Sequence, residues 1–502
     1  MTLATKEPTA HKLRLLTVSN RGPKEFHRDE KGDVTAVPGQ GGLSTALSVA
    51  ASLYPATWLS SPLTAIDREI ADGTIAPACA DGASHFVSTG PRAYELYYGC
   101  FANEVLWFLQ HGMAWPEELT AEKRREAWTE GYAAVNSAFA AKIVEELDTG
   151  AYRAVMFHDY HFYWAPLLVR RQRPDVFMQH FVHIPWPEAG EWDRLEPDIV
   201  VSICEGLLAN DSLVFQTPAS VRTFLATCER FLTDAEVDLD SGTVVHGGRR
   251  TRVWANGISV DPAELSEAAA SQEFSRYRFM LRGEPHQRAI VRVDRLDPTK
   301  NVLAGFQAYA YLLEQHPELH EKVYFLSLLV PTKSDIEIYR RHQDEARALA
   351  ESINQRFGNR HWKPIQLYFE HNRVQALAAM SLYDVLLVNP VADGMNLVAK
   401  EGPMLNSHDG VLVLSRTAGA HTELGCGTIS IDPHDVAGTT AALYEALMMP
   451  PAERRDRAAR IRDKVRSHDL RDWFRTLLSD IEAHTPITDA GEPSQLAETS
   501  AA

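Results

Sequence analysis

Cysteine is scarce in this sequence, and the few that occur are not spaced as pairs. Five cysteines are scattered over 502 residues: Cys79, Cys100, Cys204, Cys228 and Cys426. The sequence has no Cys-x-x-Cys motif and no paired histidines beside the cysteines. A disulfide framework and a zinc site of the usual spacing are therefore excluded, and we expect a reduced protein without a metal.

Long apolar runs and an excess of basic residues are also lacking. No segment approaches 18 consecutive apolar residues, and the start, MTLATKEPTAHKLRLLTVSN, has no charged head before an apolar run. We therefore expect a soluble, cytoplasmic protein with no membrane partner. Fifty Lys and Arg residues against 67 Asp and Glu residues give a net charge of −17, which argues against nucleic acid as a partner. A small phosphorylated substrate is compatible, because a few cations set the local potential of a site.

What is present predicts two α/β domains. A chain of 502 residues exceeds what one hydrophobic core usually fills. Short β-rich runs alternate with amphipathic stretches along the whole chain, which is typical of βαβ units and predicts two Rossmann-like, doubly wound parallel sheets. The predicted strands lie within 13–19, 154–160, 177–184, 212–217, 289–295, 322–330, 364–369, 384–389 and 410–415.

A turn-rich, charged stretch at 233–252 indicates the boundary between the domains. We expect an N-terminal domain over 13–255 and a C-terminal domain over 256–484. The helical stretch 451–484 fits either domain on sequence alone. Residues 1–12 and 485–502 contain few large apolar residues and are predicted to be disordered tails.

A glycine-rich turn follows the first predicted strand. SNR (19–21) closes that strand, and Gly39, Gly41 and Gly42 precede a predicted helix from Leu43. Glycines before a helix let backbone N–H groups approach a phosphate. A turn of this kind is a plain connector about as often, so both interpretations stay open.

Two polar residues follow neighbouring predicted strands. Asp159 in FHDYH and His183 in FVHIPWP each lie at a strand end, 24 residues apart. Ligands of open α/β sheets bind beyond the carboxyl ends of the strands, so the two side chains can converge on one site. A single histidine at a strand end is more often a core residue, and we interpret His158 and His161 as structural.

Two cations flank a turn after another predicted strand. Arg295 and Lys300 lie in VRVDRLDPTKN, on either side of Pro298. A guanidinium and an ammonium placed together can bind one diphosphate and stabilise it as a leaving group. Without further context, two solvated loop cations are the commoner arrangement.

Acidic and glycine residues follow a fourth strand, in LLVNPVADGMNLVAKEGPML. Asp393 comes after the strand, Gly394, Met395 and Asn396 offer backbone N–H groups at a helix start, and Glu401 lies about two helical turns later. The segment can present carboxylates to sugar hydroxyls and amides to phosphate. An ordinary N-cap aspartate and a surface glutamate are the alternative interpretation.

Taken in order, the motifs SNRGP, GGL, YYGCFANEVLW, HDYH, HIPWP, FQT, DRLDPTK and DGMNLVAKE resemble those of the trehalose-6-phosphate synthase family of retaining glycosyltransferases, family 20. The resemblance extends from about residue 13 to residue 480. It implies the GT-B fold, with the two domains facing a central cleft. It also implies transfer of glucose from a nucleotide-glucose to glucose 6-phosphate, which makes α,α-trehalose 6-phosphate.

The resemblance also implies roles for individual residues. His183, Asp159, Arg295 and Lys300 would form the catalytic group. Donor binding would fall to Gly41, Gly42, Arg295, Lys300, Asp393, Gly394, Met395, Asn396, Leu397 and Glu401. Acceptor binding would fall to Arg21, Tyr98, Trp107 and Asp159, although Tyr98 and Trp107 are core aromatics by composition alone.

The sequence departs from the family pattern near the acceptor. Of two tryptophans expected after the first helix, Trp58 is present and the second position is Ser61. An arginine expected before Ile-Asn as a phosphate ligand is Ser352, and Arg356 is a candidate substitute. These changes bear on acceptor identity more than on the class of donor.

The resemblance implies front-face displacement, in which the leaving phosphate helps to deprotonate the acceptor, with no cofactor and no metal. Because the Ala- and Arg-rich composition is typical of high-GC bacteria, where relatives use GDP-glucose, we expect GDP-glucose ahead of UDP-glucose. A homo-oligomer is compatible with the family.

Alternative functions stay open on the sequence. They are a pseudo-glycosyltransferase of the validoxylamine-phosphate-synthase type, a glucosylglycerol-phosphate synthase and a non-catalytic sugar-phosphate sensor. A dinucleotide dehydrogenase is disfavoured, because no Gly-x-Gly-x-x-Gly follows the first strand.

Overall fold

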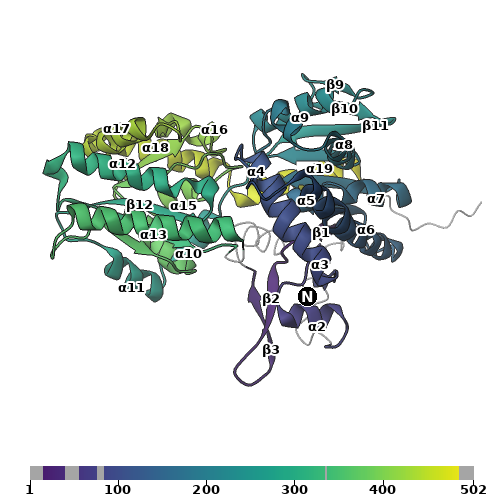
Figure 1. The fold of residues 1–502 in the computed structure, drawn as a ribbon, viewed down its shortest axis with the longest axis horizontal. Helices are drawn as coiled ribbons and strands as arrows, with labels where there is room; N and C mark the ends of the chain where they lie inside the picture. The colour runs from purple at the N-terminus through teal and green to yellow at the C-terminus, as the bar shows by residue number, and fades with distance from the viewer. Residues whose placement is uncertain (1–14, 40–55, 76–83, 334–335, 486–502) are drawn as a thin grey trace, which may run out of the picture.

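Two α/β units lie side by side in the computed structural model (Figure 1). The structure describes residues 15–39, 56–75, 84–333 and 336–485. Each unit contains a largely parallel sheet covered by helices on both faces. The expectation of an α/β protein with two parallel sheets is confirmed.

The first sheet has nine strands among the described residues, in the order β5-β4-β1-β6-β7-β8-β11-β10-β9. All neighbours pair in parallel except β10, which runs against β11 and β9. The strands are β1 (Leu15–Val18), β4 (Ala56–Ser60), β5 (Ser84–Phe86), β6 (Ala154–His158), β7 (Phe177–Val182), β8 (Ser212–Phe215), β9 (Glu236–Asp238), β10 (Thr243–His246) and β11 (Arg249–Ala255). The stretch 233–252, expected as a turn-rich boundary, therefore extends this sheet with three strands.

In the described part of the second unit, the sheet has six parallel strands in the order β14-β13-β12-β15-β16-β17. Its central strands are mainly apolar and almost wholly buried, as is typical of parallel strands covered on both faces, although Arg292 and Asp294 are buried charged residues among them. The strands are β12 (Arg288–Arg295), β13 (Val323–Val330), β14 (Ile365–Tyr368), β15 (Val385–Val388), β16 (Val411–Ser415) and β17 (Ile429–Ile431). A separate hairpin, β2 (Lys24–Arg28) and β3 (Val34–Pro38), projects from the first unit (Figure 1).

Helices connect the strands in both units. In the first unit they are α2 (Ala65–Ala71), α3 (Pro91–Tyr94), η1 (Glu95–Leu106), α4 (Trp107–Gln110), α5 (Ala121–Glu126), η2 (Ala127–Tyr132), α6 (Ala133–Asp148), η3 (Tyr160–Phe162), α7 (Ala165–Gln172), η4 (Ala189–Arg194), α8 (Pro197–Leu208) and α9 (Pro218–Phe231). In the second they are α10 (Pro262–Ala269), α11 (Gln272–Leu281), η5 (Pro298–Lys300), α12 (Val302–Gln315), η6 (Pro317–Leu319), α13 (Glu337–Phe357), α14 (Arg373–Met380), α15 (Val398–Leu405), α16 (His421–Leu424), η7 (Gly425–Gly427), α17 (Val436–Met448) and α18 (Pro451–Ser467).

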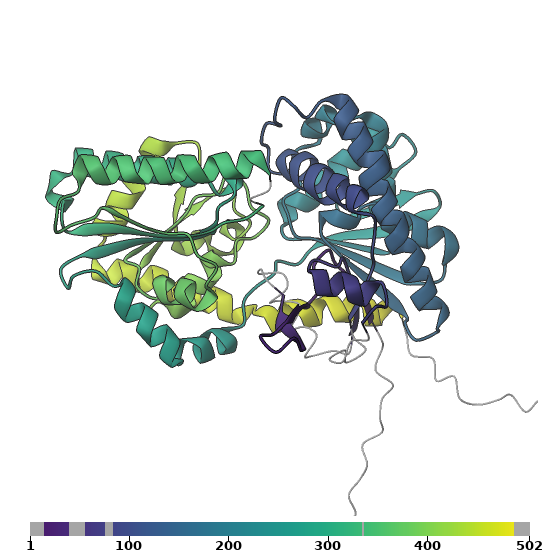
Figure 2. The ribbon, with the colours of Figure 1, turned by 60° about the horizontal axis from the view of Figure 1, so that its bottom comes forward.

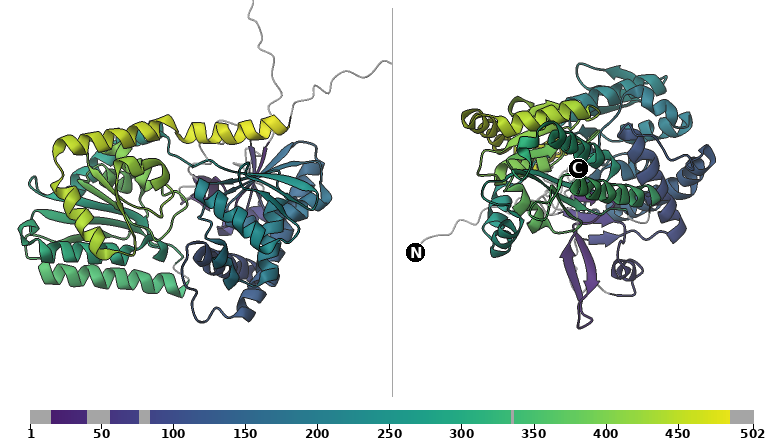
Figure 3. Two further views of the ribbon diagram at one scale, coloured as in Figure 1. Left: turned by 90° about the horizontal axis from the view of Figure 1, so that it is seen from above. Right: turned by 60° about the vertical axis from the view of Figure 1, so that its left-hand side comes forward.

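The last helix, α19 (Leu470–His484), returns to the first unit (Figures 2 and 3). Gln179 on β7 donates to Asp480 at 2.8 Å, and Arg252 on β11 forms an ion pair with Asp480 at 2.7 Å. Asn256 donates to the carbonyl of Trp473 at 3.0 Å. Helix α19 lies in the range that we assigned to the C-terminal domain, but it packs on the N-terminal sheet.

No helix among the described residues combines the length and the apolar character that a bilayer crossing requires. The tails that we predicted to be disordered, 1–12 and 485–502, fall outside the described residues except for Thr485.

Candidate active site where the two sheets meet

Asp159 and His183 meet at the carboxyl ends of β6 and β7. Asp159 has a left-handed backbone, with φ of 71°, and its N–H donates to the carbonyl of Phe181 at 2.7 Å. Its Oδ1 accepts from the backbone N–H of His183 at 3.3 Å. The two residues therefore converge, as their positions at adjacent strand ends predicted.

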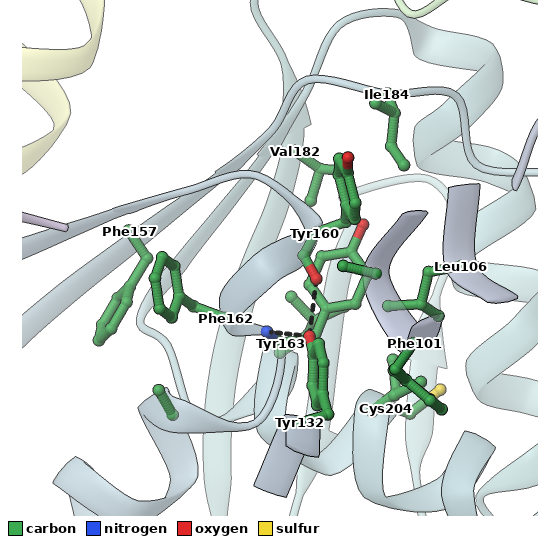
Figure 4. Close-up of a cluster of buried hydrophobic side chains, with 14 of the residues drawn as sticks. Phe101, Leu106, Tyr132, Phe157, Tyr160, Phe162, Tyr163, Val182, Ile184 and Cys204 are labelled. Atoms are coloured by element: carbon green, nitrogen blue, oxygen red, sulfur yellow. Dashed lines mark hydrogen bonds between the residues drawn. The ribbon is translucent and has the colours of Figure 1, made fainter. Parts of the chain in front are cut away.

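Tyr132 bonds to the backbone of the loop after Asp159, within a cluster of buried aromatic side chains (Figure 4). The Tyr132 hydroxyl donates to the carbonyl of Tyr160 at 2.6 Å and accepts from the N–H of Tyr163 at 2.9 Å. Burial raises the pKa of Asp159 to about 7, against the opposing effect of the N–H groups of Tyr160 and His183. The carboxyl group is therefore partly protonated at neutral pH.

His183 lies in a group of neutral imidazoles. Its Nε2 is 3.1 Å from Nδ1 of His158. Burial, together with the neighbouring His158 and His180, holds the pKa of His183 well below its usual range. An uncharged imidazole can bond sugar hydroxyls without repelling the nearby cations.

Four of the predicted donor residues lie at or just beyond the ends of β12 and β15. The ammonium of Lys300 forms an ion pair with Asp393, whose Oδ2 also accepts from Nδ2 of Asn396 at 3.0 Å. Burial alone would raise the pKa of Asp393, but Lys300 outweighs it and holds that pKa below its usual range. Arg295, at the last position of β12, is exposed.

The DGMN segment forms one of the contacts between the units. Gly394 lies against the carbonyl of His183, so closely that a Cβ at residue 394 would fall well inside 3.0 Å of that oxygen. Asn396 has a left-handed backbone, with φ of 78°, and its Oδ1 accepts from the N–H of Ala399 at 3.2 Å. Met395 is buried, and Leu397 precedes the first residue of α15. The amides at this helix start are thus next to His183.

Glu401 lies in α15 and is engaged by an arginine. Arg373 donates to Glu401 at 3.2 Å and also forms an ion pair with Glu264 at 3.0 Å. Burial raises the pKa of Glu401, and Arg373 opposes that rise. Arg373 was not predicted, although it stands at the start of a helix that follows a predicted strand.

The predicted acceptor residues Tyr98 and Trp107 share one face of a continuous helix, η1 followed by α4. In a regular α-helix nine residues make about 2.5 turns and would point the two rings apart. Segment η1 is π-helical and takes more residues per turn. Tyr98 stacks on His161 with ring centroids 6.0 Å apart, and Trp107 lies 5.6 Å from Tyr160.

Trp107 joins the acceptor residues to the second unit. Its indole N–H donates to Oδ1 of Asp297 at 3.3 Å. The Arg295 guanidinium lies 5.3 Å and the Lys333 ammonium 4.2 Å from the centroid of the ring. Cations over the face of tryptophan are attracted by its quadrupole, so this contact favours the observed placement of both.

Lys333 is a candidate site residue that the sequence analysis missed. Its side chain is only 6% exposed, its ammonium donates to the hydroxyl of Tyr339 at 2.9 Å, and Asp297 Oδ2 is 3.7 Å away. Burial lowers the pKa of Lys333 to about 7, although Asp297 opposes that effect. Lys333 lies three residues after Val330, the last residue of β13, so the rule applied to the other strand ends would have found it.

The other residues expected near the acceptor, Arg21, Trp58 and Ser61, bond to neighbouring residues of the first unit. Arg21 is exposed and pairs with Glu25 at 3.1 Å. Ser61 is buried and donates to Asn20 at 3.0 Å, and Trp58 donates to Ser19 at 2.7 Å.

The suggestion that Arg356 replaces a phosphate ligand at Ser352 is wrong. Both residues are exposed on α13, and Arg356 pairs with Glu314 at 2.7 Å. Arg356 is about 25 Å along that helix from Tyr339, which contacts Lys333. Gly41 and Gly42 lie outside the described residues. Within the described ranges, no group of three or more His, Cys, Asp or Glu residues is placed to hold a metal ion.

The family model described as Glycosyltransferase family 20 matches residues 13–483. The chain belongs to glycosyltransferase family 20. A family relative named trehalose-6-phosphate synthase, from Mycolicibacterium gilvum, is 30% identical over 500 residues, and the match covers 97% of each chain. An Arabidopsis thaliana relative, named probable α,α-trehalose-phosphate synthase (UDP-forming) 2, is 29% identical. That match covers 95% of this chain but 58% of the relative, so the chain spans somewhat more than half of that protein.

Solved structures of the family have the same fold. A Burkholderia xenovorans α,α-trehalose-phosphate synthase (UDP-forming) in complex with glucose-6-phosphate is 27% identical, with a TM-score of 0.76. The match covers 93% of this chain and 100% of that one. The GT-B fold and the assignment as a glycosyltransferase are thereby confirmed.

Proposed function

We propose that the protein transfers glucose from a nucleotide-glucose to glucose 6-phosphate and so makes α,α-trehalose 6-phosphate. The observation that carries the proposal is the meeting of three cations, Arg295, Lys300 and Lys333, with Asp159 and Trp107 of the other unit. Transfer between two phosphorylated sugars requires separate positive groups for the donor diphosphate and the acceptor phosphate. The relatives' names support the same reaction.

In this proposal the donor binds to the second unit. Arg295 and Lys300 hold the diphosphate, and the amides from Gly394 to Leu397 add hydrogen bonds to it. Asp393 is released from Lys300 to bind hydroxyls of the glucose, and Glu401 binds the ribose. Gly41 and Gly42 are proposed to lie against the diphosphate from the first unit.

The acceptor binds beside Trp107. Lys333 and Arg21 neutralise the phosphate of glucose 6-phosphate, and Tyr98 and Trp107 line the sugar. Asp159 bonds acceptor hydroxyls, for which a partly protonated carboxyl group can both donate and accept. His183 bonds the transferred glucose.

We propose front-face displacement as the chemistry. The bond from the anomeric carbon to the diphosphate breaks, the acceptor hydroxyl attacks the same face, and its proton passes to the departing phosphate oxygen. We assign Asp159 to positioning, because a partly protonated carboxyl group can both donate to and accept from acceptor hydroxyls. The cations stabilise the charge that develops on the leaving group.

The nucleotide base and the cellular setting stay predictions. The UDP-forming names of relatives favour UDP-glucose over the GDP-glucose that composition suggested. A reaction without metal or cofactor, a cytoplasmic location and a homo-oligomer also remain expectations.

The test is nucleotide release from UDP-, GDP- and ADP-glucose, with and without glucose 6-phosphate, with the product identified by mass. Release that depends on glucose 6-phosphate and gives a disaccharide phosphate supports the proposal. The same assay is repeated with glycerol 3-phosphate and with an aminocyclitol phosphate. Nucleotide release that requires one of these compounds would show that it, and not glucose 6-phosphate, is the acceptor. Binding of sugar phosphate without release from any donor would indicate a sensor.

A further inference from the structure

Arg292 is a charged side chain buried inside the second unit, behind the predicted diphosphate site. It lies on β12, three residues before Arg295, and is 0% exposed. Its Nε is 2.9 Å from Oδ2 of Asp294, and its Nη1 donates to Oδ1 of Asn389 at 2.7 Å. Its Nη2 donates to the backbone carbonyl of Lys300. The guanidinium therefore connects β12 and β15 to the turn that carries Lys300.

The helix after that turn leaves space for this guanidinium. A Cβ at Gly305, on α12, would lie 2.5 Å from Nη1 of Arg292 and 3.3 Å from the Leu387 side chain. A side chain at position 305 would have to displace this guanidinium. The buried guanidinium and Gly305 thus fit one another.

The turn is held at two successive carbonyls. Arg292 binds the carbonyl of Lys300, and Asn389 donates to the carbonyl of Asn301 at 3.3 Å. Asn301 has a left-handed backbone, with φ of 59°, and its side chain donates to the carbonyl of Pro433 at 2.8 Å. These bonds determine the direction in which Lys300 leaves the backbone.

A buried ion pair is a costly way to stabilise a fold, because a well-packed apolar pair of similar volume is often as stable. The charges here continue into the predicted donor site. Arg292 faces Asp294, Asp294 interacts with Lys300, and Lys300 is paired with Asp393. The signs of the charges alternate along this row. Arg292 therefore stabilises Asp294, which in turn interacts favourably with Lys300 at the predicted donor site.

We propose that Arg292 is a positioning residue that holds Lys300 in the geometry needed to bind the donor diphosphate. This inference rests on the proposed function, in which Lys300 binds that diphosphate. Arg292 touches no substrate, and it acts through the carbonyl of Lys300. Its loss is therefore expected to weaken binding of the nucleotide and to leave the acceptor site intact.

The experiment compares four variants of the full chain: Arg292→Met, Arg292→Lys, Gly305→Ala and Arg170→Met. Arg170 is the matched control, because it is a buried arginine of the first unit that pairs with Asp211 at 2.6 Å and binds three backbone carbonyls. Calorimetry gives the Kd of UDP and of GDP, steady-state kinetics give kcat and each KM, and a melting curve gives Tm.

Arg292→Met is expected to raise the Kd of the preferred nucleoside diphosphate by about tenfold or more, the scale for weakening a hydrogen bond to a charged group. KM for glucose 6-phosphate should stay within about twofold. Gly305→Ala should reproduce the nucleotide defect without removing a charge, and Arg292→Lys should restore part of the affinity. Arg170→Met should lower Tm and leave the Kd unchanged.

An unchanged Kd in folded Gly305→Ala and Arg292→Lys would overturn the proposal, even where Arg292→Met does not fold. An equal loss of donor and acceptor affinity that follows Tm, as in Arg170→Met, would also overturn it and indicate a purely structural residue. A wild-type protein that binds nucleoside diphosphate but transfers no glucose would overturn the proposed function, while the Kd values still decide the role of Arg292. A wild-type protein that binds no nucleoside diphosphate would overturn both.

Discussion

Gly394 of the second unit is packed against the backbone carbonyl of His183 in the first unit. On its other side, the carbonyl of Gly394 meets Gly419 so closely that Gly419 also has no room for a Cβ. The two units therefore touch backbone to backbone, beside Lys300 and Asp393. This contact sets how near the first sheet comes to the predicted donor site.

Gly394→Ala is expected to reduce turnover by about 10²-fold, because the added methyl group pushes His183 away from the DGMN segment. Gly190→Ala is the control, since a Cβ there meets nothing within 4 Å. The measurement is kcat together with Tm for both variants. Normal turnover in Gly394→Ala would show that this approach is not needed for activity.

Arg295→Ala is expected to lower kcat by about 10²-fold or more, the scale for losing one preorganised group that stabilises charge. Arg460→Ala removes an exposed arginine that pairs with Asp456 on α18, and it should leave kcat unchanged. Single-turnover glucose transfer is the assay. A near-normal kcat for Arg295→Ala would contradict its assignment to the diphosphate.

The acceptor KM is expected to depend on pH through Lys333. Burial lowers the pKa of this ammonium to about 7. Above pH 7 the Lys333 side chain of the free protein is therefore mainly neutral, and it must take up a proton before it can bind the phosphate as a cation. KM for glucose 6-phosphate should rise above pH 7, by up to about tenfold per pH unit. Lys333→Arg should flatten this rise, because arginine stays charged. A wild-type KM that is constant from pH 6.5 to pH 9 would refute the role.

Asp159→Asn is expected to become more stable relative to wild type as pH rises. Burial raises the pKa of Asp159 to about 7, whereas an unfolded aspartate titrates near 4. Its contribution to stability is therefore complete below pH about 4 and is lost as pH rises through about 7. The difference in Tm between the variant and wild type should grow from pH 5 to pH 8. Asp344→Asn, an exposed change on α13, should show no such trend.

Trp473→Ala is expected to destabilise the protein by about 3–5 kcal/mol. Trp473 is fully buried, and its ring meets that of Phe181 on the first sheet at a centroid distance of 5.3 Å. Phe279→Ala, which removes a side chain with 72% exposure, should change the free energy of unfolding by less than about 0.5 kcal/mol. Denaturant titration of both variants measures the difference. Equal effects would contradict the packing of α19 against the first sheet through Trp473.

The expectation that polar residues follow the strand ends explains what the sequence placed and what it missed. It placed Asp159, His183 and Arg295 at strand ends, as the structure has them, because each follows a mainly apolar run. It was not applied to the end of β13, so Lys333 was missed. Strands β9 to β11 were also missed, because their charged, turn-rich sequence pairs at an edge of the sheet where one face needs little apolar cover.

The sequence by itself determined the two parallel sheets, since their buried central strands are mainly apolar runs, and it determined which strand ends carry polar groups. Tertiary structure decided how the carboxyl edges of the two sheets come together. Nothing in the local pattern shows that α19 returns to the first sheet or that η1 is wound so that Tyr98 and Trp107 share a face. The return of α19 depends on contacts between residues hundreds of positions apart, as between Gln179 and Asp480, and such contacts leave no periodicity in the chain.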